Sequence, residues 1–125
     1  MEALNAFFTA EETSLWFPNH RPSTAEIELF VREKSKQFTV VVFSKSGCAF
    51  CERAIRLLQT LLPMLDIPYR MNIVEMNTVD AGYLQPVLKD LTDQSTVPNI
   101  YIDQQHIGGY DKLCAYIQEV IVKRL

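Results

Sequence analysis

The stretch from Phe38 to Leu62 constrains the fold most, because a strand pattern passes directly into a helix pattern with two cysteines at the junction. Residues 38–43 read Phe-Thr-Val-Val-Val-Phe, a β-branched and aromatic run that is typical of a buried strand. Apolar residues then recur at helical spacing, at Ala54, Leu57, Leu58, Leu61 and Leu62. Pro63 predicts the end of this helix, because proline cannot continue a helix interior.

A second strand and a preceding helix are predicted around this unit. Ser23 and Glu26 fit a capping box that opens a helix running to about Lys34. Ile67-Pro68 opens a strand from Tyr69 to about Glu75. Because one helix separates the two strands, we expect them to be parallel with a right-handed crossover.

The C-terminal half predicts a helix, a hairpin and a last helix. The helix carries Leu84, Val87, Leu88 and Leu91 on one face, and Pro86 fits this helix well only if it lies in the first turn. Asn99–Ile102 and His106-Ile107 form a hairpin around residues 103–105, which ends at Gly108-Gly109. The final helix should face inward with Leu113, Ile117, Val120 and Ile121.

These elements predict an α/β fold with one mixed sheet of about four strands and helices on both faces. Residues 23–125 form the domain, and residues 1–22 form an N-terminal extension that ends in a proline-rich loop. In this extension we expect Trp16 and Phe17 to pack on the domain; a docking arm is the alternative.

Composition excludes several classes of protein. With 125 residues and a formal net charge of −3, the chain suits one domain and not a nucleic-acid binder. No apolar run is long enough to span a bilayer. The first 20 residues contain no Lys or Arg, which argues against a secretory signal or a transit peptide. Three cysteines are too few for a disulfide framework, so we expect a reducing compartment and a cytoplasmic location.

The tetrad Cys48-Ala-Phe-Cys51 carries the chemistry. Cys48 stands at the start of a helix, where free N–H groups and the helix dipole favour a thiolate. Lys45 adds a cationic charge three residues upstream. A structural zinc site would need four ligands, and Cys114, His20 and His106 offer no paired spacing to complete one. Cys114 is expected to be buried and inert; a regulatory thiol that becomes glutathionylated or pairs with another chain is the alternative.

Two further motifs suggest a binding groove. Thr96-Val97-Pro98 enters a strand, and a cis peptide bond there would present the Val97 backbone to an extended peptide; a trans proline at a strand start is the alternative. Gly108-Gly109-Tyr110-Asp111 allows close approach of a ligand and offers a helix start to a carboxylate. A plain tight turn with Asp111 as the N-cap would explain the second motif equally well.

The three motifs together, in this order and spacing, resemble a glutaredoxin of the dithiol CxxC type, over about residues 23–125. The resemblance implies a thioredoxin-like fold, a cis Pro98 and glutathione as co-substrate. It also implies that Cys48 is the nucleophile, that Cys51 resolves its mixed disulfide, and that Lys45 assists. The residues implied to hold glutathione are Lys45, Cys48, Phe50, Gln85, Thr96, Val97, Pro98, Gly109, Tyr110 and Asp111.

The implied activity is glutathione-dependent reduction of protein–glutathione mixed disulfides and protein disulfides, by a monomer that serves cell redox homeostasis. The partners would be glutathione, or a related low-molecular-weight thiol, and the disulfide-containing proteins themselves. Ala49 replaces the proline common in dithiol members, which leaves open a dimer that holds a [2Fe–2S] cluster through Cys48 and glutathione. Ser95 stands where members often have an arginine for the glycine carboxylate. A catalytically weak binding module is the remaining alternative.

Overall fold

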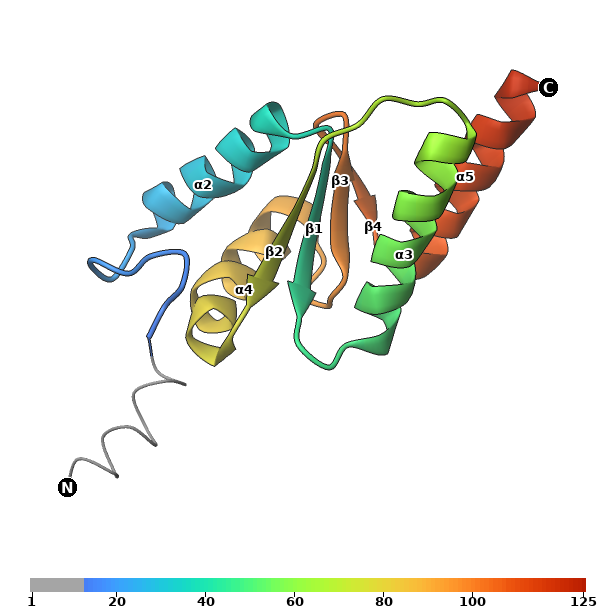
Figure 1. The fold of residues 1–125 in the computed structure, drawn as a ribbon. Helices are drawn as coiled ribbons and strands as arrows, with labels where there is room; N and C mark the ends of the chain where they lie inside the picture. The colour runs from blue at the N-terminus through green and yellow to red at the C-terminus, as the bar shows by residue number, and fades with distance from the viewer. Residues whose placement is uncertain (1–12) are drawn as a thin grey trace.

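A four-stranded mixed sheet lies between two pairs of helices, α2 with α4 on one face and α3 with α5 on the other (Figure 1). The computed structural model describes residues 13–125. The strands are β1 (Val40–Lys45), β2 (Met71–Met76), β3 (Asn99–Ile102) and β4 (Gln105–Gly108). The helices are α2 (Thr24–Gln37), α3 (Ala49–Met64), α4 (Thr78–Thr92) and α5 (Tyr110–Arg124). The predicted α/β fold and the predicted order of its elements are therefore confirmed.

The sheet has the strand order β2-β1-β3-β4, with β1 at its centre. β1 and β2 are parallel, as the predicted βαβ unit requires, and β1 and β3 are antiparallel. The β3–β4 hairpin turns over two residues, Asp103 and Gln104, and not over the predicted three. Both have positive φ, 50° and 65°, which matches the right-handed twist of a two-residue hairpin. Gln105 thus joins β4 and pairs with Ile102.

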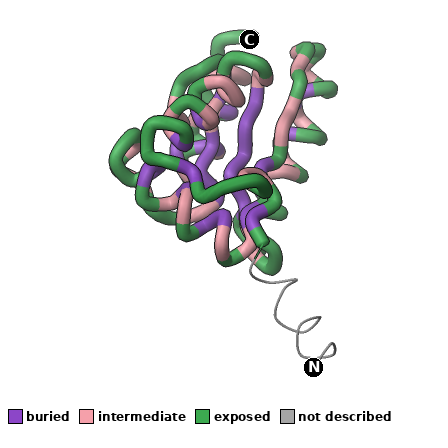
Figure 2. Tube along the Cα trace, turned by 90° about the vertical axis from the view of Figure 1, so that its left-hand side faces the viewer, coloured by how far each residue is buried: buried purple, intermediate pink, exposed green. Residues whose placement is uncertain are grey.

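Alternation along β1 divides the core into two layers. Val41 and Phe43 pack with α2 and α4, whereas Val40 and Val42 pack with α3 and α5. All four side chains are fully buried, so the central strand is covered on both faces. Figure 2 shows buried trace running through the middle of the molecule and exposed trace at its outer edges.

Several predicted boundaries are wrong by a few residues. α2 continues to Gln37 and is capped by Phe38, whose N–H bonds the Lys34 carbonyl at 3.1 Å. β1 therefore starts at Val40 and not at Phe38, and it continues past Phe43 because Ser44 and Lys45 still pair with β2. β2 likewise spans Met71–Met76 and not 69–75. The capping box of Ser23 and Glu26 is confirmed, and α3 ends one residue after Pro63.

α4 departs from the prediction at Pro86. This proline lies in the middle of the helix and not in its first turn. It faces solvent, so its ring does not disturb the core, and the helix loses only the bond from residue 86 to the Gly82 carbonyl. Leu84, Val87 and Leu88 are buried as predicted, but Leu91 is 36% exposed. In α5, Leu113 and Ile117 are buried, whereas Val120 and Ile121 are only half-buried.

The segment before α2 is tied to the start of α4 through Asp80, whose side chain is fully buried. The Asp80 carboxylate accepts the Ser14 hydroxyl at 2.5 Å and the backbone N–H groups of Leu15 and Trp16 at 3.2 and 3.3 Å. Trp16 and Phe17 pack against the core beside Phe30, which confirms that these aromatics pack on the domain. The rest of the predicted extension, residues 1–12, lies outside the described residues. In the described part of the chain, no helix combines the length and hydrophobicity needed to cross a membrane.

Candidate active site

Cys48 is the N-cap of α3, at the end of a short turn that leaves β1. Gly47 makes this turn possible, because its φ of +76° lies in the left-handed region that side chains disfavour. The Cys48 sulfur accepts the backbone N–H of Cys51 at 3.2 Å, and the residue is half-exposed. Because a helix N-terminus concentrates free N–H groups and positive potential, the Cys48 sulfur lies at the positive end of α3, where solvent can reach it.

Cys51 differs from Cys48 in its surroundings. It lies one turn into α3 on the inward face and is 1% exposed. Burial raises the pKa of the Cys51 thiol, and the neighbouring Cys48 adds to the rise. Both cysteines are free thiols. The pair therefore offers one accessible sulfur and one buried, protonated sulfur beside it.

The Val97–Pro98 peptide bond is cis, as predicted, and the Val97 carbonyl oxygen lies 3.9 Å from the Cys48 sulfur. Gln94 holds this loop, since its side-chain amide donates to the carbonyls of Thr96 and Pro98 at 3.0 and 2.9 Å. Sequence reasoning missed Gln94. A glutamine just after a helix carries no spacing or motif signal that would single it out.

A buried polar network lies behind Pro98. Asn99 is 1% exposed; its side-chain amide donates to the Thr92 hydroxyl at 3.3 Å, and its oxygen lies 2.8 Å from His106 Nε2. Burial lowers the pKa of His106, which favours the neutral ring in this network. Asn99 was also missed, because its role depends on partners from α4 and β4.

The α5 helix starts at the same end of the molecule. Gly109 is its N-cap, so Asp111, the second residue of the helix, is not the cap. The first bond within the helix runs from the Leu113 N–H to the Gly109 carbonyl, which leaves the N–H groups of Tyr110 and Asp111 without a helical acceptor. A Cβ at Gly109 would lie 3.7 Å from the Pro98 carbonyl oxygen, so this helix start and the Pro98 loop are in contact.

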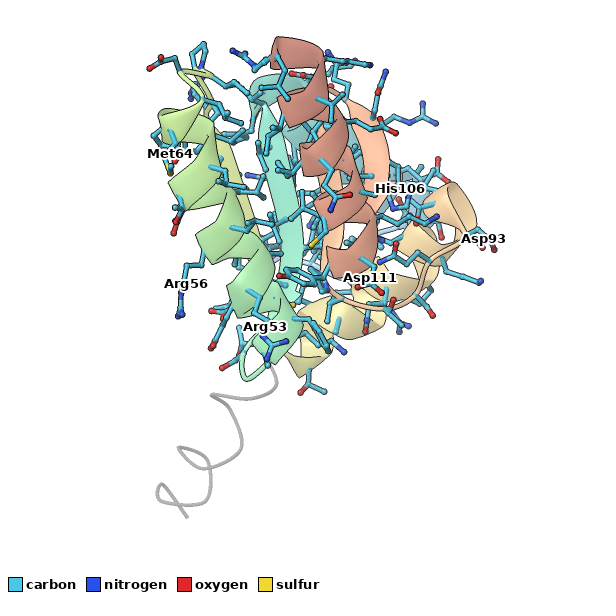
Figure 3. The ribbon with its side chains drawn as sticks, turned by 90° about the vertical axis from the view of Figure 1, so that its right-hand side faces the viewer. Arg53, Arg56, Met64, Asp93, His106 and Asp111 are labelled. Atoms are coloured by element: carbon cyan, nitrogen blue, oxygen red, sulfur yellow. The ribbon has the colours of Figure 1, made fainter. Side chains whose placement is uncertain are left out.

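An aromatic rim connects α3 to α5. The Phe50 ring is 5.8 Å from the Tyr110 ring, and the Arg53 guanidinium lies 5.2 Å from the Phe50 ring centre. Figure 3 shows Arg53 and Asp111 at the same end of the two helices. A hydrogen bond to the Cys114 thiol raises the pKa of Tyr110. Cys114 thus lies beside the rim. Its side chain is half-buried, so the prediction that it is buried is wrong.

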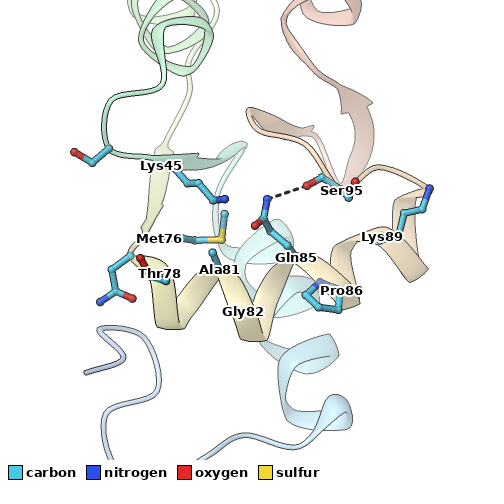
Figure 4. A pocket seen from close by; sticks show the side chains of 11 residues that line it. Lys45, Met76, Thr78, Ala81, Gly82, Gln85, Pro86, Lys89 and Ser95 are labelled. Atoms are coloured by element: carbon cyan, nitrogen blue, oxygen red, sulfur yellow. Dashed lines mark hydrogen bonds between the residues drawn. The ribbon is translucent and has the colours of Figure 1, made fainter. Parts of the chain in front are cut away.

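Lys45 and Gln85 line a groove of about 870 Å³ between the end of β1 and the exposed face of α4 (Figure 4). Gln85 donates to the Ser95 carbonyl at 2.8 Å. Among the described residues, no hydrogen bond or ion pair joins the Lys45 ammonium to the Cys48 sulfur. Within residues 13–125, no three His, Cys, Asp or Glu side chains are grouped as a metal site would require.

The structure thus brings most of the predicted site residues to one end of the sheet. The Val97 carbonyl lies beside the Cys48 sulfur, Phe50 on α3 contacts Tyr110 at the start of α5, and Gly109 adjoins the Pro98 loop. Lys45 and Gln85 lie in the groove that adjoins Ser95, one residue before Thr96. A thiol at a helix start, beside the Val97 carbonyl and a groove that Lys45 lines, is equipped for thiol–disulfide exchange with an anionic peptide.

Comparison with known proteins agrees with this arrangement. The family model "Glutaredoxin" matches residues 40–107. Glutaredoxin-C1 of Arabidopsis thaliana is 37% identical over 100 residues, which cover 78% of this chain and 76% of that protein. Glutaredoxin-1 of Saccharomyces cerevisiae is 35% identical over 85 residues, which cover 66% of this chain and 74% of that protein.

Solved glutaredoxin structures have the same fold as this chain. A wheat glutaredoxin aligns with a TM-score of 0.65 at 33% identity, and a buckwheat glutaredoxin–glutathione complex aligns with a TM-score of 0.64 at 27% identity. Each alignment covers 78% of this chain and 87% of the other. The thioredoxin-like fold is therefore confirmed, and the chain, with its Cys48-x-x-Cys51 motif, belongs to the glutaredoxin family of thiol–disulfide oxidoreductases.

Proposed function

We propose that the protein reduces protein–glutathione mixed disulfides and protein disulfides, with glutathione as the reductant. The single observation that best supports this is the Cys48 sulfur, which is half-exposed and accepts an N–H at the α3 start. The family typically uses glutathione, and one structural neighbour is a glutathione complex. Substrates would be glutathionylated or disulfide-containing proteins.

The proposed reaction begins when the glutathione half of a mixed disulfide binds beside Cys48. Its γ-glutamyl carboxylate meets the free N–H groups of Tyr110 and Asp111, its cysteinyl unit lies along the Val97 backbone, and its glycine carboxylate reaches Lys45 and Gln85. Thr96, Pro98, Gly109 and Phe50 complete the walls of this binding site. The arrangement presents the glutathione sulfur of the mixed disulfide to Cys48.

The Cys48 thiolate attacks that sulfur, the disulfide bond breaks, and the substrate leaves as a thiolate that takes a proton from water. Cys48 then carries glutathione. The thiolate of a second glutathione attacks the glutathione sulfur, which frees the Cys48 thiolate and releases oxidised glutathione. The electrons come from two glutathione molecules, one of them delivered as the mixed disulfide.

Cys51 has a part only when the substrate is a protein disulfide. There Cys48 becomes bonded to one substrate sulfur. Cys51 then attacks the Cys48 sulfur, its proton goes to the departing substrate thiolate, and a Cys48–Cys51 disulfide forms, which two glutathione molecules reduce while they become oxidised glutathione. Because burial raises the pKa of Cys51, its thiol stays protonated in the resting protein and does not compete with Cys48 as the first nucleophile.

The test is turnover of a cysteine–glutathione mixed disulfide, coupled to glutathione reductase and NADPH. We expect Cys48→Ser to abolish turnover and Cys51→Ser to retain much of it. Cys114→Ser is the matched control, since serine keeps a polar partner for Tyr110. An active Cys48→Ser protein would refute the assignment, and a wild-type protein no faster than free glutathione would favour a binding module.

A further inference from the structure

The groove beside Lys45 extends well beyond the place proposed for the glycine of glutathione. One wall is the exposed face of α4 from Thr78 to Lys89, with Lys45 and Ser95 lying across from it (Figure 4). At the rise of an α-helix, Thr78 and Lys89 are about 16 Å apart along the axis. A fully extended tripeptide spans only about 10 Å. In the proposed binding mode only the glycine of that tripeptide reaches this groove, so glutathione leaves most of it unfilled.

The wall of the groove includes Gly82, which is exposed. Since Pro86 has no N–H, the Gly82 carbonyl, four residues earlier, lacks the donor that α-helical bonding would supply. Glycine has no side chain, so backbone is what it contributes to the groove. A Cβ added at Gly82 would meet no atom within 4 Å, which means that packing does not require glycine here.

The groove also carries cations along its length. Among the described residues, the Lys45 ammonium has no ion-pair partner. Lys89 is held at the far end by Asp93, through its carboxylate at 3.0 Å and its backbone carbonyl at 3.1 Å. An ammonium has three N–H groups, so one remains for a ligand. The groove therefore holds two ammonium groups, those of Lys45 and Lys89, for the carboxylate of a peptide to meet.

We propose that the protein also accepts γ-glutamyl-cysteinyl-glycyl peptides that continue past the glycine by one or two residues. This inference rests on the proposed function, because it assumes the same position for the cysteinyl unit. The first added peptide N–H donates to the Gly82 carbonyl, and the terminal carboxylate moves from Lys45 toward Lys89. The added residues lie away from Cys48, so the exchange chemistry is unchanged.

The test measures binding, so that it does not depend on turnover. Isothermal titration compares S-methylglutathione with the S-methyl tetrapeptide γ-Glu-Cys-Gly-Glu on wild type, Gly82→Leu and the matched control Gly82→Ala. We expect wild type and Gly82→Ala to bind the tetrapeptide at least as tightly as S-methylglutathione. Gly82→Leu should lose about tenfold or more for the tetrapeptide alone, because its side chain fills the groove, and Lys89→Gln should weaken the tetrapeptide severalfold.

Tetrapeptide binding more than tenfold weaker than that of S-methylglutathione on wild type would overturn the proposal, as would equal losses of both ligands on Gly82→Leu. Failure of the proposed function gives a different result. In that case S-methylglutathione itself does not bind, or the coupled assay shows no turnover although both peptides bind. Circular dichroism of the Gly82 variants checks that α4 is intact.

Discussion

Gln94 is expected to control affinity for glutathione without touching the reacting sulfur. Its side-chain amide donates to the Thr96 and Pro98 carbonyls on either side of Val97, and it adjoins Gly108. Gln94→Ala removes both bonds. A hydrogen bond contributes about 0.5–1.5 kcal/mol net, so the loss is about 1–3 kcal/mol, and the buried Pro98 carbonyl places it toward the upper half.

If this energy orders the loop that receives the cysteinyl unit, a loss of about 2 kcal/mol raises KM for a glutathione mixed disulfide by about 30-fold. Gln94→Glu keeps the shape but sets a carboxylate against two carbonyl oxygens, so it should be worse than alanine. Steady-state kinetics should show the change in KM with kcat little altered. The rate of alkylation of Cys48 by iodoacetamide should also stay unchanged, because the hydrogen bonds of the Gln94 side chain go to the Thr96 and Pro98 carbonyls and not to the α3 start.

Two results would refute this reasoning. KM within twofold of wild type in Gln94→Ala would mean that the loop is held by the rest of the fold. A loss in kcat and in Cys48 alkylation, with KM constant, would mean that Gln94 acts on the nucleophile and not on the binding surface.

Three other predictions concern stability. Gly108→Ala should lower the free energy of unfolding in urea by about 1–3 kcal/mol, because Gly108 has φ +123° and a Cβ there would lie 3.0 Å from the Lys112 side chain. Gly82→Ala should raise it by up to about 1 kcal/mol. Equal effects of the two substitutions would contradict the geometry. Asp80→Ala should lower the free energy of unfolding by about 3 kcal/mol, since three donors lose the carboxylate that they bond. It should also speed chymotryptic cleavage near Trp16. An unchanged cleavage rate would show that Asp80 does not hold this segment. Burial lowers the pKa of His106, so the unfolded chain takes up the proton at a higher pH than the folded chain does. The free energy of unfolding should therefore be highest above pH about 6.5 and fall as the pH drops toward the lowered pKa. His106→Gln should flatten this fall between pH about 7.5 and 5.5.

The active-site motif could be predicted because its parts are local. Neighbouring residues alone indicate the β-branched strand, the glycine turn and the helix that follows Cys48. The same holds for the capping box at Ser23. The glutathione-binding roles of Gln85, Thr96 and Asp111 stay a prediction, although the structure brings them to one end of the sheet. Strand ends were misplaced because partners decide them: Ser44 and Lys45 belong to β1 only through pairing with β2.

The sequence by itself determined the fold class, the order of the elements and the position of the dithiol. The spacing of the apolar residues, the helix caps and the motifs can each be read from a short stretch of the chain. Only the tertiary structure decided that Cys51 lies on the inner face of α3, where burial raises the pKa of its thiol while Cys48 stays half-exposed. It alone revealed Gln94, Asn99 and Asp80 as supports, since each acts through partners that local pattern does not show. It also placed Pro86 in the middle of α4 and in the wall of a groove, because a proline on a solvent-facing surface costs one backbone bond, the one that the Gly82 carbonyl would accept.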